Sequence, residues 1–109
     1  MALALNVFQT VTAVVSTSPT VVYTAPVGYT GVVLLAQVSN IGTNSHDVTF
    51  VHRRGATDTR ILKEYSIAAK DAASLLTGKL VLESGDRLVI SGSDATDLEF
   101  IASILETLN

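Results

Sequence analysis

The two histidines are the first residues to consider for metal or acid–base chemistry, because histidine is the commonest metal ligand. The chain contains His46 and His52 and no cysteine. A jelly-roll metalloenzyme needs an HxH pair on one strand, a nearby carboxylate and a later histidine. The spacing of His46 and His52 does not provide that pair. We therefore expect two surface or interface histidines, with no metal site and no bound cofactor.

The carboxylates and hydroxyls do not form a recognisable catalytic set. Most aspartates lie in or beside expected turns, where Asp bonds to nearby backbone. Serine and threonine are plentiful, but no GxSxG elbow, no Ser-x-x-Lys and no evident histidine base accompanies them. The scattered glycines form neither a P-loop nor a dinucleotide fingerprint. We expect no catalytic residues and no enzymatic activity.

Most basic residues gather in one region, at His52-Arg53-Arg54, Arg60 and Lys63. One interpretation is a patch that meets an acidic partner or a phosphate backbone. The other is a solvated hairpin whose charges discourage edge pairing. No aromatic residues interleave with these charges to stack on bases, and the formal net charge is -3. The composition therefore predicts no binding to nucleic acid and none to a membrane.

Two tyrosines flank the turn around Pro26 and Gly28. If Tyr23 and Tyr29 are exposed beside this rigid turn, they could bind a sugar or a peptide. The alternative is that they cap one end of the fold.

Short strands are the elements that must position these residues. Runs rich in valine, threonine and leucine alternate with turn signals containing proline, glycine, asparagine or aspartate. The pattern predicts an all-β fold, an antiparallel β-sandwich of seven or eight strands, jelly-roll or Ig-like in type. At 109 residues we expect a single domain spanning 1–109, with residues 1–8 as a docking arm. The N-terminus lacks the basic region of a signal peptide, and no run is long enough for a transmembrane helix.

Two expected strands are apolar on both faces. In Tyr29 to Asn40, the alternation places Leu34, Ala36 and Val38 on one face and Val33 and Leu35 on the other. In Leu98 to Leu108, Ile101 and Leu105 lie opposite the main apolar stripe. Such strands predict partial cover by another chain.

Residues 60–76 have two interpretations. A helical stripe with Gly78 as its C-terminal cap fits the apolar spacing. We favour two strands with Tyr65 and Ile67 facing inward, because no capping box or proline marks the start of a helix.

The segment Leu80 to Ile90 predicts two strands that meet at Ser84-Gly85. A two-residue hairpin there would place Glu83 opposite Asp86, which is unfavourable. We expect instead a corner by which the chain passes from one sheet to the other.

Three motifs together resemble small virion structural proteins of tailed bacteriophages. They are Val22-Tyr23-Thr24-Ala25-Pro26-Val27-Gly28-Tyr29-Thr30, Gly78-Lys79-Leu80-Val81-Leu82-Glu83-Ser84-Gly85-Asp86-Arg87-Leu88, and Ser103-Ile104-Leu105-Glu106. The resemblance covers about Val21 to Glu106. It implies a non-enzymatic capsid decoration (cement) protein, or alternatively a tail, neck or baseplate component, located in the virion after assembly in the host cytoplasm. A recognition module for carbohydrate or a host surface is the rival from another class.

The implied partners are copies of the same chain, for example in trimers, and virion proteins such as the major capsid protein. We expect three groups of residues to form the interfaces: apolar strand residues, the N-terminal arm, and arginines facing an acidic neighbour. They are Val33, Leu35, Ile101 and Leu105; Ala2, Leu3, Leu5 and Phe8; and Arg53, Arg54 and Arg60.

Overall fold

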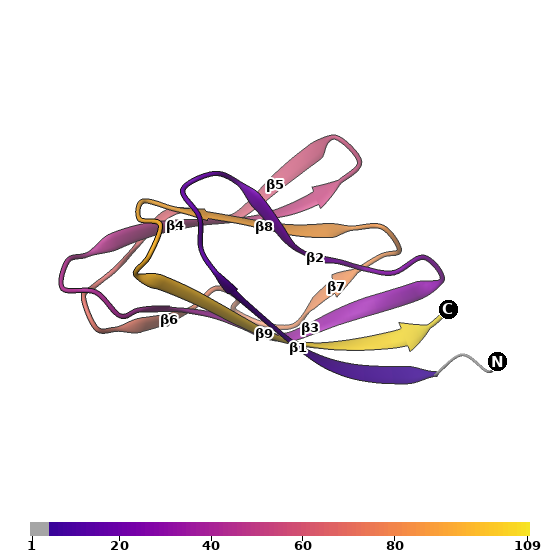
Figure 1. Ribbon diagram of the computed structural model, residues 1–109. Helices are drawn as coiled ribbons and strands as arrows, with labels where there is room; N and C mark the ends of the chain where they lie inside the picture. The colour runs from indigo at the N-terminus through magenta and orange to yellow at the C-terminus, as the bar shows by residue number, and fades with distance from the viewer. Residues whose placement is uncertain (1–4) are drawn as a thin grey trace.

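The computed structural model describes residues 5–109, and these form two β-sheets packed face to face (Figure 1). Within this range no helix is long and apolar enough to cross a membrane. The described strands are β1 (Asn6–Val14), β2 (Thr20–Thr24), β3 (Tyr29–Asn40), β4 (His46–Arg54), β5 (Thr57–Ile67), β6 (Ala72–Ser74), β7 (Leu80–Leu82), β8 (Arg87–Gly92) and β9 (Leu98–Leu108).

Every strand pair is antiparallel, so the predicted all-β antiparallel sandwich is confirmed, with nine strands in the described part instead of seven or eight. The first sheet has the order β1-β9-β3-β6, and β7 also pairs with β3. The second has the order β2-β8-β4-β5. In Figure 1 the first sheet forms the lower layer and the second the upper layer, and the start of β1 lies at the same end as the C-terminus.

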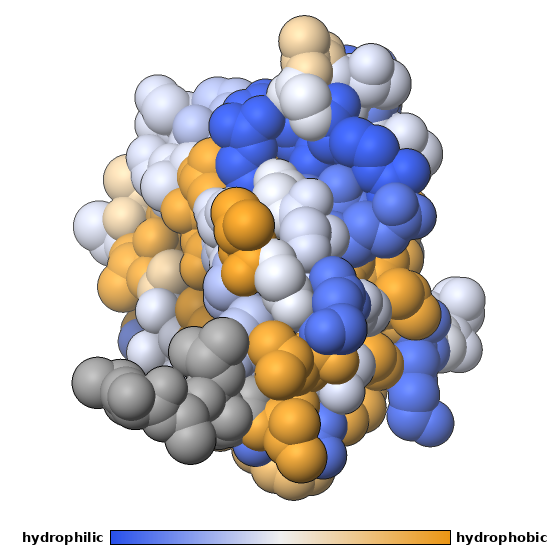
Figure 2. Space-filling view, turned by 90° about the vertical axis from the view of Figure 1, so that its right-hand side faces the viewer, coloured by the Kyte–Doolittle hydropathy of each residue, from blue (hydrophilic) through white to orange (hydrophobic). Residues whose placement is uncertain are grey.

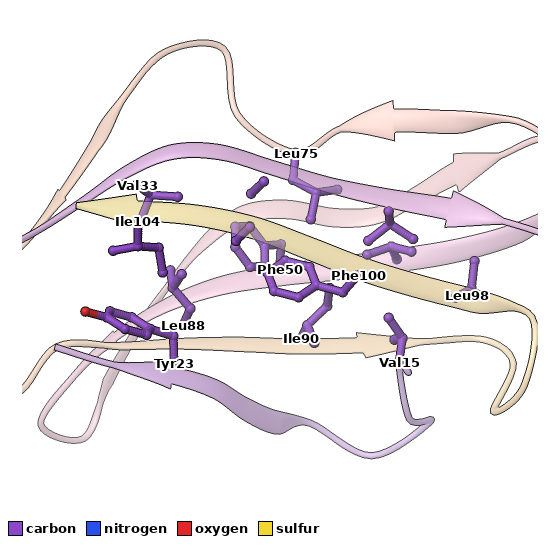
Figure 3. Close-up of a cluster of buried hydrophobic side chains, with 14 of the residues drawn as sticks. Val15, Tyr23, Val33, Phe50, Leu75, Leu88, Ile90, Leu98, Phe100 and Ile104 are labelled. Atoms are coloured by element: carbon purple, nitrogen blue, oxygen red, sulfur yellow. The ribbon is translucent and has the colours of Figure 1, made fainter. Parts of the chain in front are cut away.

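The core lies between the two sheets (Figure 3). It is built from the inward-facing residues of both sheets, which alternate with outward-facing residues along the strands. Phe50 of β4 and Phe100 of β9 meet across it, with ring centroids 5.8 Å apart. Burying side chains of this size stabilises the folded state by about 2–3 kcal/mol each. Val48 and Phe50, two positions apart on β4, are both fully buried in this core.

The predicted corner at Ser84-Gly85 is confirmed. β7 pairs with β3 in one sheet and β8 pairs with β2 and β4 in the other, so no hairpin joins β7 to β8. The chain turns between Glu83 and Asp86, where the backbone N–H of Asp86 donates to the carbonyl of Glu83 at 2.9 Å. Gly85 has a φ of 85°, a conformation that glycine adopts without steric cost. Leu82 and Leu88 therefore enter the same core from opposite sheets.

A bulge in β3 overturns the predicted faces of this strand. The register with β9 shifts between Val33 and Leu35, so Leu34 is an extra residue and the alternation changes phase there. Val33 and Ala36 both point into the core, whereas Leu34 and Leu35 are both exposed. The expectation that Val33 shares an outer face with Leu35 is wrong, because Val33 is 0% exposed.

Residues 60–76 form strands β5 and β6, as favoured, and not a helix. The inward placement of Ile67 is confirmed, but that of Tyr65 is wrong, because Tyr65 is 47% exposed. β5 is an edge strand whose register with β4 shifts twice, and Glu64 beside Tyr65 has a φ of 51°. Such irregularities defeat a simple period of two.

Candidate interaction surfaces

β1 leaves one edge of the first sheet unpaired in the described part of the chain. Along all of Asn6–Val14 it pairs with β9 on one side, and no described strand pairs with its other side. Valine and threonine favour this extended conformation. The nine residues contain no charge, no proline and no glycine. An edge of this kind presents unpaired backbone N–H and C=O groups to any chain that adds a further strand.

The remaining sheet edges are short or interrupted. β6 has three residues and β2 has five, with a register shift in its pairing to β8. β5 is long, but it contains Asp58, Arg60, Lys63 and Glu64 together with its bulges. Charges and bulges on an edge strand oppose the addition of another strand. β1 is therefore the described edge best suited to pairing with a second chain.

An apolar row crosses the outer face of the first sheet beside this edge. Phe8 of β1 pairs with Leu105 of β9, Leu105 pairs with Val32 of β3, and Val32 pairs with Val81 of β7. Phe8 is 74% exposed and Val81 56% exposed. Exposed apolar residues that are contiguous, and not scattered singly, mark surfaces that other molecules cover. Figure 2 shows apolar side chains gathered on the lower half of one end of the molecule, below a hydrophilic region.

The basic region forms ion pairs within its own chain. Arg54 donates two hydrogen bonds to Asp86, from Nε at 2.9 Å and from a terminal nitrogen at 2.7 Å. His52 and the backbone N–H of Glu83 also contact this carboxylate, at 3.0 Å and 2.9 Å. The bonds from Arg54 hold the pKa of Asp86 well below its ordinary range, although burial acts in the opposite direction. This network fastens the β7–β8 corner to β4.

The neighbouring arginines differ in their partners. Arg53 forms a bidentate pair with Asp58 across the β4–β5 hairpin, at 2.6 Å and 3.0 Å, and this pair lowers the pKa of Asp58. Arg87 donates to the backbone carbonyl of Gly55 at 2.7 Å. Arg60 is exposed on β5. The arginines of the predicted hairpin are therefore largely paired within their own chain. The ion pair between Arg54 and Asp86 could not be predicted from the sequence, because the two residues lie 32 positions apart.

A buried polar network links the core to β1. Tyr23 donates its hydroxyl hydrogen to Glu106 at 2.5 Å, and Gln9 donates to the other carboxylate oxygen at 2.6 Å. Burial and the contact with Glu106 raise the pKa of Tyr23 well above its ordinary value. Because Tyr23 is buried, the tyrosines at the Pro26 turn do not form an exposed pair for a sugar. The order of residues does not indicate this network, since its members come from three strands.

A surface hollow beside β1 does not bring catalytic groups together. It has a volume of ≈ 550 Å³ and lies against β1, β3 and β9. Its lining contains one ionisable side chain, Glu99, among apolar and hydroxyl residues. A lone carboxylate lacks the second group that general acid–base or nucleophilic catalysis needs. The two histidines contact different aspartates, His46 near Asp97 and His52 near Asp86, so they share no site.

The apolar residues that were expected at interfaces lie in different parts of the structure. Leu35 and Ile101 are partly exposed on the outer face of the first sheet, and Leu105 belongs to the apolar row there. Leu5 and Phe8 are strongly exposed at the start of β1, whereas Ala2 and Leu3 lie outside the described residues. Val33 must be removed from the set, because its buried side chain contacts the core of its own chain.

Comparison with known proteins gives a match at the level of structure alone. No family model matches the chain, and no curated protein matches it. One solved structure that is similar comes from Bacillus endospore appendages, described as a novel family of disulfide-linked pili. The two chains are 18% identical, with a TM-score of 0.55, and the match covers 95% of this chain and 88% of the appendage chain. At this level of identity the likeness establishes a shared fold.

This match corrects the sequence-based assignment to virion structural proteins of tailed bacteriophages. The solved structure that is similar over nearly the whole chain belongs to an appendage pilus. The assignments to capsid decoration, tail, neck or baseplate, the capsid partners and the virion location are therefore wrong. The motifs behind them, a PxG turn and a glycine-aspartate corner, serve local geometry that any sandwich can use.

Proposed function

We propose that this chain is a self-associating structural subunit of a fibre, such as a surface appendage. The observation that carries the proposal is the edge strand β1, nine uncharged residues beside an exposed apolar row. Proteins that function as monomers protect such edges with charge, proline or bulges. Here the unprotected strand is the longest stretch available to another copy.

A fibre requires a contact between two different surfaces of each subunit. If the edge of β1 pairs with a different part of the next copy, the contact is head-to-tail and repeats without closing. Main-chain hydrogen bonds then supply affinity, and the alternating side chains supply register. The similarity to an appendage pilus supports a polymer of this type.

Five apolar residues and one arginine are the side chains that we propose to contact neighbouring copies. The apolar members lie at the start of β1 or on the outer face of its sheet, where burial would stabilise association by about 25 cal/mol per Å² of apolar surface removed from water. Arg60 lies on the opposite edge and would make a polar contact. The proposed set is Leu5, Phe8, Leu35, Ile101, Leu105 and Arg60.

The proposed role is non-enzymatic. In the described part of the chain, Asp86, Arg54 and His52 bind one another to fasten a corner, and Glu106 is buried behind Gln9 and Tyr23. Groups engaged in this way hold the fold together.

Copies of this chain cannot be linked by disulfide bonds between residues 1–109. The similar appendages are described as disulfide-linked pili, but this sequence contains no cysteine. We expect fibres that separate into monomers in hot detergent whether or not a reducing agent is present. A covalent ladder that survives detergent would contradict this expectation.

The edge of β1 can be tested with charges placed on two exposed threonines. T10E/T12E adds two carboxylates to the uncharged edge and should prevent assembly, because a paired strand would bury them. T43E/S45E adds two carboxylates at exposed positions of the β3–β4 loop, outside the proposed contacts, and should leave assembly unchanged.

Electron microscopy and sedimentation velocity of the purified proteins report the outcome, and circular dichroism confirms that both variants are folded. The proposal is contradicted if the wild-type chain stays monomeric at high concentration, or if T10E/T12E assembles as the wild type does.

A further inference from the structure

Two loops, each of which passes from one sheet to the other, meet at the end of the sandwich away from the C-terminus. One connects β3 to β4, and the other, residues 93–97, connects β8 to β9. The backbone N–H of Ile41 donates to the backbone carbonyl of Asp97 at 2.8 Å, and that of Ser93 donates to the backbone carbonyl of Asp47 at 2.9 Å. These bonds hold the second loop against the start of β4, where His46 is located.

Three metal-ligating side chains converge at this junction. His46 Nε2 lies 3.1 Å from Asp97 Oδ2 and 4.0 Å from Asp94 Oδ1, and one ligand atom from each residue lies within 4.8 Å of the other two. Ligands bound to Zn²⁺ at about 2.0–2.1 Å in tetrahedral geometry are about 3.3 Å from one another. His46 and Asp97 therefore already have about the separation of two corners of such a site, and Asp94 Oδ1, at 4.0 Å from His46, would have to move closer to supply the third.

The carboxylates are held in place by the loop that carries them. Asp94 Oδ2 accepts hydrogen bonds from the backbone N–H groups of Thr96 and Asp97, at 2.9 Å and 2.8 Å. The other oxygen, Oδ1, is the one nearer to His46. The Asp97 carboxylate lies against Gly42, where an added Cβ would stand 2.1 Å from Oδ2. A side chain at position 42 would displace this ligand.

The charges at the junction are unequal. One imidazole nitrogen faces two carboxylates, and a single N–H group can donate to only one of them. A divalent cation would contact all three atoms at once and offset both negative charges. The side chain of His46 is 13% exposed and those of Asp94 and Asp97 about one-third exposed, so an ion could enter from solvent.

We propose that His46, Asp94 and Asp97 bind one divalent transition-metal ion, with Zn²⁺ as the best fit. Imidazole with two carboxylates suits Zn²⁺ and its neighbours, whereas Ca²⁺ and Mg²⁺ prefer oxygen ligands throughout. The fourth position is filled by water. The ion joins the β3–β4 loop to the β8–β9 loop and so stabilises this end of the sandwich. This inference does not depend on fibre formation.

Isothermal titration of tag-free, chelator-treated protein with ZnCl₂ tests the site. We expect one ion per chain, a rise in melting temperature on binding, and a visible absorption band of four-coordinate Co²⁺ when CoCl₂ replaces zinc. H46Q and D97N should weaken Zn²⁺ binding by about tenfold or more. D71N removes the same charge from an exposed residue in another loop and should bind as the wild type does.

Two results would overturn the assignment. One is the absence of Zn²⁺ binding by folded wild-type protein at up to about 1 mM. The other is unchanged affinity in H46Q, which would place the ion elsewhere. Repeating the titration with the T10E/T12E variant separates metal binding from assembly, because the threonines of β1 are not among the ligands.

Discussion

The hydroxyl of Tyr23 donates to the carboxylate of Glu106 between the two sheets, at 2.5 Å. Tyr23 belongs to β2 of one sheet and Glu106 to β9 of the other, so this hydrogen bond crosses the sandwich. Gln9 of β1 binds the second oxygen of the same carboxylate. Gly31 makes room for the contact, because an added Cβ would lie 3.2 Å from the tyrosine hydroxyl. One buried carboxylate thus connects the assembly edge to the core.

Replacing Tyr23 with phenylalanine should lower the free energy of unfolding by about 1–3 kcal/mol. The ring remains in the core, but Glu106 loses a donor while it is still buried. Urea denaturation at neutral pH measures the loss. Y65F, at a tyrosine that is 47% exposed on β5, is the control for deleting a tyrosine hydroxyl. An unchanged unfolding free energy in Y23F would show that the bond contributes nothing net.

Tyr23 should also make the fold sensitive to alkali. Its pKa is raised in the folded state, so above about pH 10 the unfolded chain loses this proton first. The stability contributed by the protonated hydroxyl is complete below that pH and is lost as pH rises, with a slope of up to about 1.4 kcal/mol per unit. Urea titrations between pH 8 and about pH 11 should show a steeper fall for the wild type than for Y23F. Equal slopes for the wild type and Y23F would show that this pH dependence does not come from Tyr23.

Asp86 should have the opposite dependence on pH. Its pKa is lowered in the folded state, so it contributes stability above the unfolded value of about 3.9, and this contribution disappears as pH falls. D86N should be less stable by about 2 kcal/mol at neutral pH, because Arg54 and His52 lose a charged acceptor that is 2% exposed. As the pH is lowered, the difference in unfolding free energy between the wild type and D86N should become smaller. D58N, which removes a more exposed pair, should change stability much less.

The corner glycine offers a test of backbone conformation alone. An added Cβ meets nothing within 4 Å at either Gly85 or Gly78, but only Gly85 has a positive φ. Gly85→Ala should therefore destabilise the fold by about 1 kcal/mol, the cost of the left-handed conformation. Gly78→Ala should be neutral or slightly stabilising. Thermal unfolding of both variants gives the comparison, and equal melting temperatures would show that the corner relaxes.

Local patterns were sufficient to predict the sandwich and the corner between its sheets. Leu82 and Leu88 are apolar on either side of Ser84-Gly85, and the unfavourable pairing of Glu83 with Asp86 excluded a hairpin. These inferences need only neighbouring residues and a period of two. They succeeded because each strand near the corner is regular.

The remaining features depend on contacts that the order of residues does not reveal. One extra residue at Leu34 reverses the alternation in β3 and moves Val33 inward. The partners of Arg54 and His46 come from loops 32 and 51 positions away. Short turn motifs also misled the family assignment, because a rigid turn is required by the geometry of a sandwich whatever its function.

Aspartate substitutions on the two sides of the β3 bulge should separate folding from assembly. V33D places a charge in the core and should unfold the chain, because a buried unpaired carboxylate costs more than the fold can offset. L35D changes a residue that is 42% exposed on the outer face of the sheet, so the monomer should keep its melting temperature while fibre formation weakens. Circular dichroism and sedimentation velocity distinguish the two effects. Normal assembly of L35D would remove Leu35 from the proposed interface, and a folded V33D protein would contradict the phase change at Leu34.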